Sequence, residues 1–181
     1  PPDSVGIVRA AHEIGLKPKM FGGTLIGLLI TPIKTQLGPI LDGTVIMESF
    51  VPTFNFPGLA DVLKRYRAVA AGEKLDPFGY GFVPFGYAAA QVLAQAVEGT
   101  KSLDSDRLAT YMRSHTFQTI AGEIAFAKDG EWAKRRIVFT QFQHVAANNL
   151  EQFADGSVQP VLWPPQYKTG DFIYPYADAQ K

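Results

Sequence analysis

The feature that most constrains this chain is an aromatic loop, rich in glycine and proline, that runs directly into an apolar helix. Residues 76–87 read Asp-Pro-Phe-Gly-Tyr-Gly-Phe-Val-Pro-Phe-Gly-Tyr, and Ala-Ala-Ala-Gln-Val-Leu-Ala-Gln-Ala follows them. The prolines restrict the backbone, while the glycines allow tight turns and close approach to a neighbour. A rigid loop with five aromatic rings at a helix start makes a good wall for a small-molecule cleft. The alternative is that the same rings cap a hydrophobic core.

Composition sets the outer limits. The chain has 181 residues, of which 46% are hydrophobic, which is enough for one sizeable core or two small ones. Its 17 basic and 17 acidic side chains balance, so no basic surface for nucleic acid or anionic lipid is implied. Without cysteine the chain has no disulfide, thiolate metal site or cysteine nucleophile. No apolar run approaches the roughly 20 residues that a membrane helix needs.

Catalytic motifs are missing from the sequence. The three histidines, His12, His115 and His144, lie on separate predicted elements without the spacing of metal ligands. There is no Gly-x-Ser-x-Gly elbow. Gly22-Gly23-Thr24 precedes an apolar segment, but no lysine completes a phosphate-binding loop. We therefore expect a protein that is not an enzyme, with no catalytic residues, metal or cofactor.

Hydrophobic periodicity predicts an α/β fold. A near-continuous apolar run at the start of residues 44–50 is typical of a buried parallel strand. The proline-rich tail, residues 158–176, can wrap a surface but cannot be a central strand throughout. Helices are expected over residues 3–13, 59–71, 85–98 and 104–114, and strands over residues 18–21, 44–50, 122–131 and 134–142.

The chain begins without methionine, a signal peptide or a leading strand. Pro1-Pro2-Asp3-Ser4 instead has the character of a helix N-terminus already inside a domain. We therefore expect this chain to be the C-terminal portion of a longer protein.

Three segments carry a resemblance to a known family. They are the helix Tyr87-Ala-Ala-Ala-Gln-Val-Leu-Ala-Gln-Ala-Val-Glu, the strand and turn Gly122-Glu-Ile-Ala-Phe-Ala-Lys-Asp-Gly, and the tail from Leu162-Trp-Pro-Pro to Tyr174-Pro-Tyr. In this order and spacing they resemble the second half of type I periplasmic solute-binding proteins. More narrowly, the chain is similar to the branched-chain amino acid receptors of ABC transporters, over essentially its whole length.

The resemblance implies a two-lobed fold, with Rossmann-like lobes of parallel sheet and helices joined by three crossovers around a ligand cleft. It assigns residues 1–50 to the second lobe, residues 51–141 to the first lobe, and residues 142–181 to a crossover and tail that return to the second lobe. It also implies that the N-terminal half of the protein is missing from this sequence. The hinge residues implied are Phe50, Val51, Pro52, Gln141 and Phe142.

The function implied is that of a solute-binding receptor of an ABC importer. Such a receptor is exported to the periplasm with its signal peptide removed, captures a small organic acid or an amino-acid-like ligand, and delivers it to a membrane permease. The alternative is a ligand-sensing regulatory or receptor domain of the same fold. A third reading, an interaction module, rests only on the tail rich in proline and tyrosine.

The resemblance also implies a binding site. Thr24 occupies the position where the family commonly has an acidic side chain that receives the ligand ammonium. A neutral hydroxyl cannot neutralise a buried cation, which would cost several kcal/mol if left unpaired. An organic or aromatic acid therefore fits better than a branched-chain amino acid, unless a nearby acid such as Glu48 substitutes.

On the other lobe, Phe82 falls where the family places an aromatic side chain against the apolar part of the ligand. For Phe82 a place in the core is the alternative, and for the weaker candidates Tyr80 and Phe85 the core is favoured. Phe21 and Leu25 could line the cleft but are better explained by packing. The candidate ligand-binding residues are Thr24, Phe82, Gly23, Leu25 and Tyr80.

Overall fold

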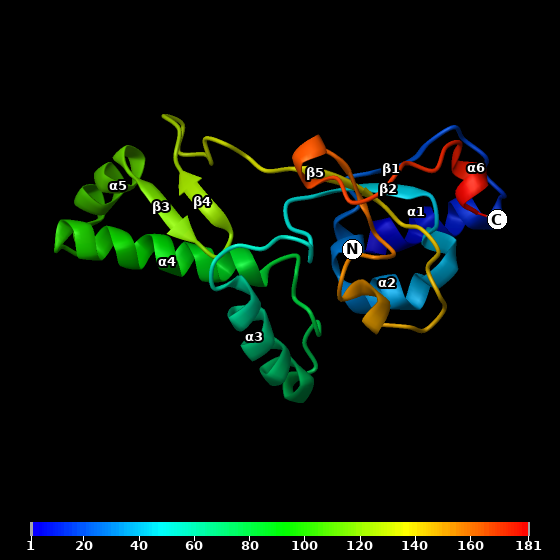
Figure 1. Ribbon diagram of the computed structural model, residues 1–181, viewed down its shortest axis with the longest axis horizontal. Coiled ribbons are helices and arrows are strands. Elements are labelled where there is room, and N and C mark those ends of the chain that lie inside the picture. Colours follow the sequence, from blue (N-terminus) through cyan, green and yellow to red (C-terminus); the bar gives the residue numbers. More distant parts are fainter. Residues whose placement is uncertain (1, 181) are drawn as a thin grey trace.

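The computed structural model describes residues 2–180, and they form two units (Figure 1). The sheet unit, residues 2–48 and 138–180, is built around a four-stranded sheet in the order β1-β2-β5-β6. Strands β1 (Phe21–Gly23) and β2 (Thr44–Glu48) are parallel, whereas β5 (Val138–Gln141) and β6 (Val161–Trp163) each run antiparallel to their neighbour. The segments on either side of residues 49–137 thus meet in a single sheet.

Helices cover the sheet unit on the side of its main core. They are α1 (Pro2–Glu13) and α2 (Thr31–Leu37), with 3-10 turns at Ile26–Leu29 and Gly38–Leu41, and a short α6 (Tyr176–Ala179) near the C-terminus. Further 3-10 turns lie at Glu151–Phe153 and Pro165–Tyr167. Most of β2 is buried because helices and neighbouring strands enclose it, as its apolar sequence predicts. The core consists of Val8, Leu28, Leu37, Leu41, Ile46, Phe78, Phe142, Val145 and Phe153.

The helical unit, residues 59–125, contains α3 (Leu59–Glu73), α4 (Val83–Thr100), α5 (Ser105–Ser114) and a hairpin of β3 (Thr116–Thr119) and β4 (Gly122–Ala125). The Asp104 side chain caps α5 by accepting a hydrogen bond from Arg107 N at 2.9 Å. Leu108, Tyr111 and Met112 pack toward Val92, Ala96 and Phe117, so this unit has a small core of its own.

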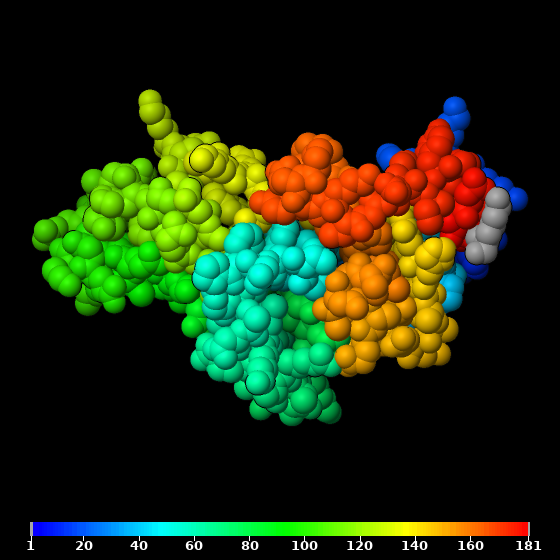
Figure 2. All heavy atoms as spheres, viewed as in Figure 1, coloured from blue at the N-terminus to red at the C-terminus, as the bar shows by residue number. Residues whose placement is uncertain are grey.

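Two connectors, residues 49–58 and 126–137, join the units (Figure 1). A second core lies at this junction and draws on both units, since Phe50, Phe54 and Leu59 pack in the same cluster as Val138 and Val161. The space-filling view shows α3 and the segment around residue 150 side by side on one face of the molecule (Figure 2). No helix within residues 2–180 is long and apolar enough to cross a membrane.

The α/β fold expected from the sequence is confirmed, and the structure adds three details. The sheet is mixed, because only β1 and β2 are parallel. The first strand covers residues 21–23 instead of residues 18–21. The tail contributes an edge strand, β6, which lies between Pro160 and Pro164, where a strand that pairs on one side only tolerates the missing N–H groups.

Candidate ligand-binding cleft

A cavity of about 340 Å³ opens where the two units meet. Its walls come from the sheet unit, both connectors and the start of α4. None of the nine side chains or backbones that line it is charged. The lining residues are Thr24, Ile26, Leu29, Met47, Ser49, Phe50, Gly81, Phe85 and Trp132.

Two hydroxyl side chains stand at the carboxyl ends of the parallel strands. Thr24 directly follows β1, and Ser49 directly follows β2, whose Ile46 pairs with Gly23. Both residues are exposed, and neither hydroxyl makes a hydrogen bond to another described residue. Ligands of α/β sheets bind in the crevice beyond the carboxyl ends of the strands. These hydroxyls can therefore donate or accept hydrogen bonds to a polar group of a ligand.

Two aromatic side chains supply much of the remaining wall. Phe85 lies in the first turn of α4, which begins at Val83 and contains Pro84 in the same turn, where proline is tolerated. Trp132 comes from the second connector, and its Nε1 donates to Glu123 O at 3.3 Å. Mostly apolar walls with a few polar groups are typical of small-molecule sites.

The sequence-predicted binding residues lie in different environments. Thr24 lines the cavity, and Gly23 is the exposed last residue of β1 next to it. Leu25 packs on the main core of the sheet unit, as the packing alternative expects. Phe82 is 63% exposed at the N-terminus of α4 and is not among the lining residues, whereas Phe85, three residues later, is.

Tyr80 packs against both cores, and its hydroxyl donates to Ala154 O at 2.8 Å. Burial raises the pKa of this phenol above its usual range. Phe21 packs on the main core, with its ring 5.4 Å from that of Tyr176. Neither Tyr80 nor Phe21 lines the 340 Å³ cavity, although Tyr80 lines a smaller hollow beside it.

The residues predicted as hinges separate into two groups. Phe50, Val51 and Pro52 lie on the first connector, with Phe50 and Val51 buried in the junction core. Gln141 and Phe142 lie at the end of β5 inside the sheet unit, and Phe142 is fully buried in its core. The Gln141 side chain donates to Gly43 O and Ile173 O, so it ties the C-terminal tail to the sheet.

Next to the cleft, a polar cluster joins four segments of the sheet unit. The Lys34 ammonium donates to Gln159 Oε1 at 3.1 Å, and Gln159 Nε2 donates to the Glu48 carboxylate and to Thr140 Oγ1. Lys34 is 5% exposed and Glu48 is 7% exposed. Glu48 is therefore already engaged and does not line the 340 Å³ cavity, although both Lys34 and Glu48 line a smaller hollow beside it.

Burial governs the titration of this pair. Desolvation lowers the pKa of Lys34, partly offset by the negative charges of Glu48 and Asp76. Desolvation also raises the pKa of Glu48, partly offset by the Lys34 charge and by the hydrogen bond from Gln159. Each group thus lessens the cost of burying the other.

Several lining residues were not predicted from the sequence: Ile26, Leu29, Met47, Ser49, Gly81 and Trp132. A usable signal existed for Ser49, since it lies near the end of the strand expected over residues 44–50, and ligands of α/β sheets bind beyond the carboxyl ends of strands. Trp132 gave no such signal, because its place follows from the path of a connector. Among residues 2–180, no group of three or more histidine, aspartate or glutamate side chains could hold a metal ion.

Comparison with known proteins identifies the family of this chain. The chain matches the family model described as periplasmic binding protein over residues 1–149, so it belongs to that family, as its motifs suggested. It is 28% identical to the Leu/Ile/Val-binding protein homolog 1 of Brucella suis over 132 residues, which cover 72% of this chain and 33% of that protein. The homologue from Brucella melitensis matches equally well. The chain thus spans about a third of the length of these relatives.

Solved structures show the same fold. A leucine binding protein from Thermotoga maritima superposes with a TM-score of 0.59 at 20% identity, covering 91% of this chain and 43% of its own. A periplasmic binding protein from Burkholderia mallei superposes with a TM-score of 0.65 at 18% identity, covering 92% of this chain and 44% of its own. A fatty acid ABC transporter substrate-binding protein from Thermomonospora curvata superposes with a TM-score of 0.60 at 17% identity, covering 99% of this chain and 43% of its own. The family and these relatives are binding proteins.

Proposed function

We propose that this chain is part of a solute-binding receptor of an ABC importer, which holds a small molecule in the cleft between two lobes in the periplasm and delivers it to a membrane permease. The sheet unit would be part of the second lobe and the helical unit part of the first. The observation that carries the proposal is the uncharged cavity between the units, with Thr24 and Ser49 at the carboxyl ends of two parallel strands. Family membership supports it.

The cavity also favours a class of ligand. Its apolar surface, including Phe85 and Trp132, suits a branched or aromatic hydrocarbon body. Its polar groups are neutral, and Glu48 is bound to Gln159 and near Lys34, so none of the lining residues offers an anion to a ligand ammonium. We therefore favour a small organic acid, aliphatic or aromatic, over a branched-chain amino acid, although relatives are named for both amino acids and fatty acids.

A thermal-shift screen tests the receptor function and the ligand class together. The protein that carries this chain is screened with leucine, isoleucine and valine against 4-methyl-2-oxopentanoate, benzoate and a short fatty acid. A ligand that binds only the folded state raises the melting temperature. We expect the acids to raise it and the amino acids to have little effect. No shift with any compound would contradict the receptor function.

The substitution Thr24→Glu tests the ammonium argument. A carboxylate at this position can accept charge-assisted hydrogen bonds worth about 1.5–3 kcal/mol, so affinity for leucine should rise by roughly 10- to 100-fold while affinity for the acids falls. Isothermal titration calorimetry measures both, and Thr24→Gln is the uncharged control of equal size. An unchanged ligand profile in Thr24→Glu would remove the argument.

We further propose that the helical unit packs against additional chain of the kind that the longer relatives possess, which would correspond to the N-terminal half of such a receptor. Its two-stranded sheet has no other strand beside it among the described residues, and Val69, Tyr87 and Leu93 are exposed. The hairpin has only the small core that it shares with α4 and α5 to pack against, so local opening should be easier there than in the four-stranded sheet. On its own, the 181-residue chain should exchange amide hydrogens faster in β3 and β4 than in β2 and β5, as mass spectrometry would show. Equally slow exchange in all four strands would contradict this proposal.

A further inference from the structure

The aromatic loop of the helical unit is anchored in the sheet unit. Phe78 is 3% exposed and belongs to the main core of the sheet unit, beside residues such as Leu28 and Phe153. Its ring stacks on that of Tyr80, with centroids 5.3 Å apart and planes 11° from parallel. The segment between α3 and α4 therefore reaches across the junction and places an aromatic side chain inside the neighbouring unit.

A single carboxylate shapes this loop and fastens it. Asp76 Oδ1 accepts hydrogen bonds from the backbone N–H groups of Phe78 and Gly79, both at 3.0 Å, which fixes the turn. Asp76 Oδ2 accepts the N–H of Thr31 at 2.6 Å, at the beginning of α2 in the sheet unit. The two oxygens thus have separate tasks, one within the loop and one between the units.

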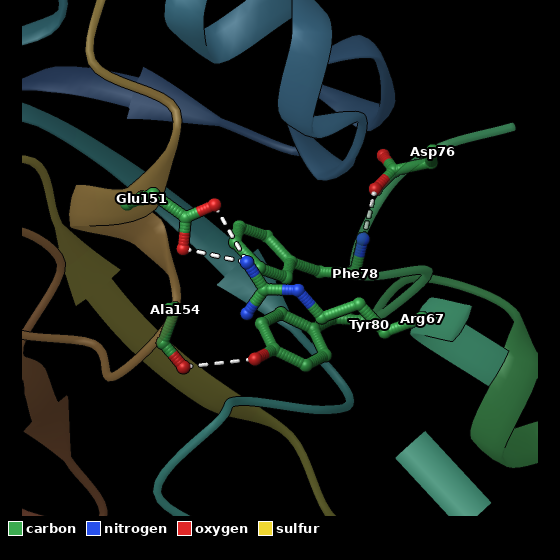
Figure 3. Close-up of polar contacts among 6 residues, drawn as sticks. All are labelled: Arg67, Asp76, Phe78, Tyr80, Glu151 and Ala154. Carbon is green, nitrogen blue, oxygen red and sulfur yellow. Dashed lines mark hydrogen bonds and ion pairs between the residues drawn. The ribbon is translucent and has the colours of Figure 1, made fainter. Parts of the chain in front are cut away.

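Two further contacts join the same surfaces (Figure 3). The Tyr80 hydroxyl donates to Ala154 O at 2.8 Å, and Arg67 Nη2 donates to both carboxylate oxygens of Glu151 at 2.6 and 2.7 Å. The Arg67 guanidinium also lies 4.8 Å from the centre of the Phe78 ring. Arg67 and Tyr80 belong to α3 and the loop, whereas Glu151 and Ala154 belong to the sheet unit.

The loop leads straight to the cleft. Gly81 follows Tyr80, lines the cavity and lies so close to Leu29 that an added Cβ would be 3.1 Å from the Leu29 Cβ. Phe85 follows in the first turn of α4. The positions of Gly81 and Phe85 relative to Thr24 therefore depend on what holds the loop against the sheet unit.

We propose that residues 76–80 form a strap between the two units and that Asp76 is the positioning residue that sets the separation of the cleft walls. Only noncovalent contacts hold this loop against the sheet unit, so the strap can hold the helical unit in place or release it. Any effect of the strap on ligand affinity rests on the proposed function. Its effect on the separation of the units does not, and that separation can be measured without ligand.

Distance measurements by electron spin resonance test the strap. The chain has no cysteine, so Glu13→Cys and Ala90→Cys place one spin label on α1 and one on α4, both at exposed positions. We expect a narrow distance distribution for the otherwise unchanged chain. Loss of charge-assisted hydrogen bonds in Asp76→Ala should raise the population of longer distances on the order of tenfold. Asp61→Ala, which removes a carboxylate paired with Arg65 on the surface of α3, is the matched control and should change nothing.

Asp76→Asn separates the two tasks of the side chain. Its amide oxygen can still accept from Phe78 and Gly79, but its NH₂ group cannot accept the Thr31 N–H. We expect it to widen the distribution like Asp76→Ala while circular dichroism shows an unchanged fold. Tyr80→Phe, which loses one hydrogen bond and keeps the ring, should widen it less.

A charge exchange covers the case in which an Asp76 variant fails to fold. Arg67→Glu should lengthen the distances by repulsion from Glu151, and the double variant Arg67→Glu/Glu151→Arg should restore them. Distances that stay unchanged in folded Asp76→Asn, or in Arg67→Glu if the Asp76 variants unfold, would overturn the strap. Either result leaves the ligand screen unaffected, so a failed strap and a failed receptor function are distinguishable.

Discussion

Replacing Lys34 with methionine is expected to lower the free energy of unfolding by about 3–5 kcal/mol, the usual cost of removing one partner of a buried charge pair. Methionine fills much of the same volume, but the Glu48 carboxylate then lies buried without its counter-charge. Urea denaturation measures the loss. Lys64→Met, at an exposed position on α3, should stay within about 0.5 kcal/mol of the unchanged chain.

The loss should depend on pH in a defined direction. In Lys34→Met, Glu48 loses the strongest influence that lowers its pKa, so its folded pKa rises further above that of the unfolded chain. Between these two pKa values the folded state binds a proton that the unfolded state lacks, so the free energy of unfolding falls as the pH rises. The deficit of the variant should therefore be smaller near pH 5 than near pH 8.

Removing both charges gives the decisive comparison. Lys34→Met/Glu48→Leu replaces the pair with apolar side chains, which is often neutral or stabilising. We expect it to recover most of the stability lost in the single variant and to abolish the added pH dependence. A single variant as stable as the unchanged chain, or a double variant worse than the single one, would mean that Lys34 and Glu48 do not compensate each other.

Phe78→Ala is expected to cost about 3–5 kcal/mol of unfolding free energy, since it removes a buried ring and leaves a cavity. The chain offers a matched control four residues along the same loop, because Phe82 is 63% exposed and its replacement by alanine should change stability by less than about 0.5 kcal/mol. The comparison uses urea denaturation of both variants. Equal effects would show that the Phe78 ring does not contribute to the core as its burial indicates.

Local chemistry in the sequence predicted most of the helices well. The helix α3 begins at the expected residue, Leu59. The helix α5 begins directly after Asp104, which caps it, close to the expected start at residue 104. β3 was missed because Thr116–Thr119 is too short for alternation to mark it and depends on its partner β4. The antiparallel pairing of β2 with β5 could not be foreseen, since residues 49–137 separate the two strands and no local pattern states the direction of such a pair.

The cleft was predicted only in part, for reasons of side-chain direction. The family resemblance, not a local pattern, is the basis for expecting Thr24 in the cleft, and the choice between Phe82 and Phe85 depends on where α4 begins. Because Phe82 precedes the first helical residue, Val83, its ring points to solvent, and Phe85 takes the place on the wall. Burial of Lys34 could likewise not be predicted. The helical period puts Lys34 on the same face as Thr31 and Leu37, but lysine is almost never fully buried unless it is paired, so the residue type favours the surface.

The adjacency of β2 and β5 has a consequence for how the molecule assembles. As the chain leaves the ribosome, α3, α4, α5 and the hairpin are complete before β5 exists, so the central strand pair can form only after the intervening part is made. The entropy lost on closing such a loop grows only with the logarithm of its length. Lengthening the turn between α4 and α5 should therefore add little to the entropic cost of completing the sheet.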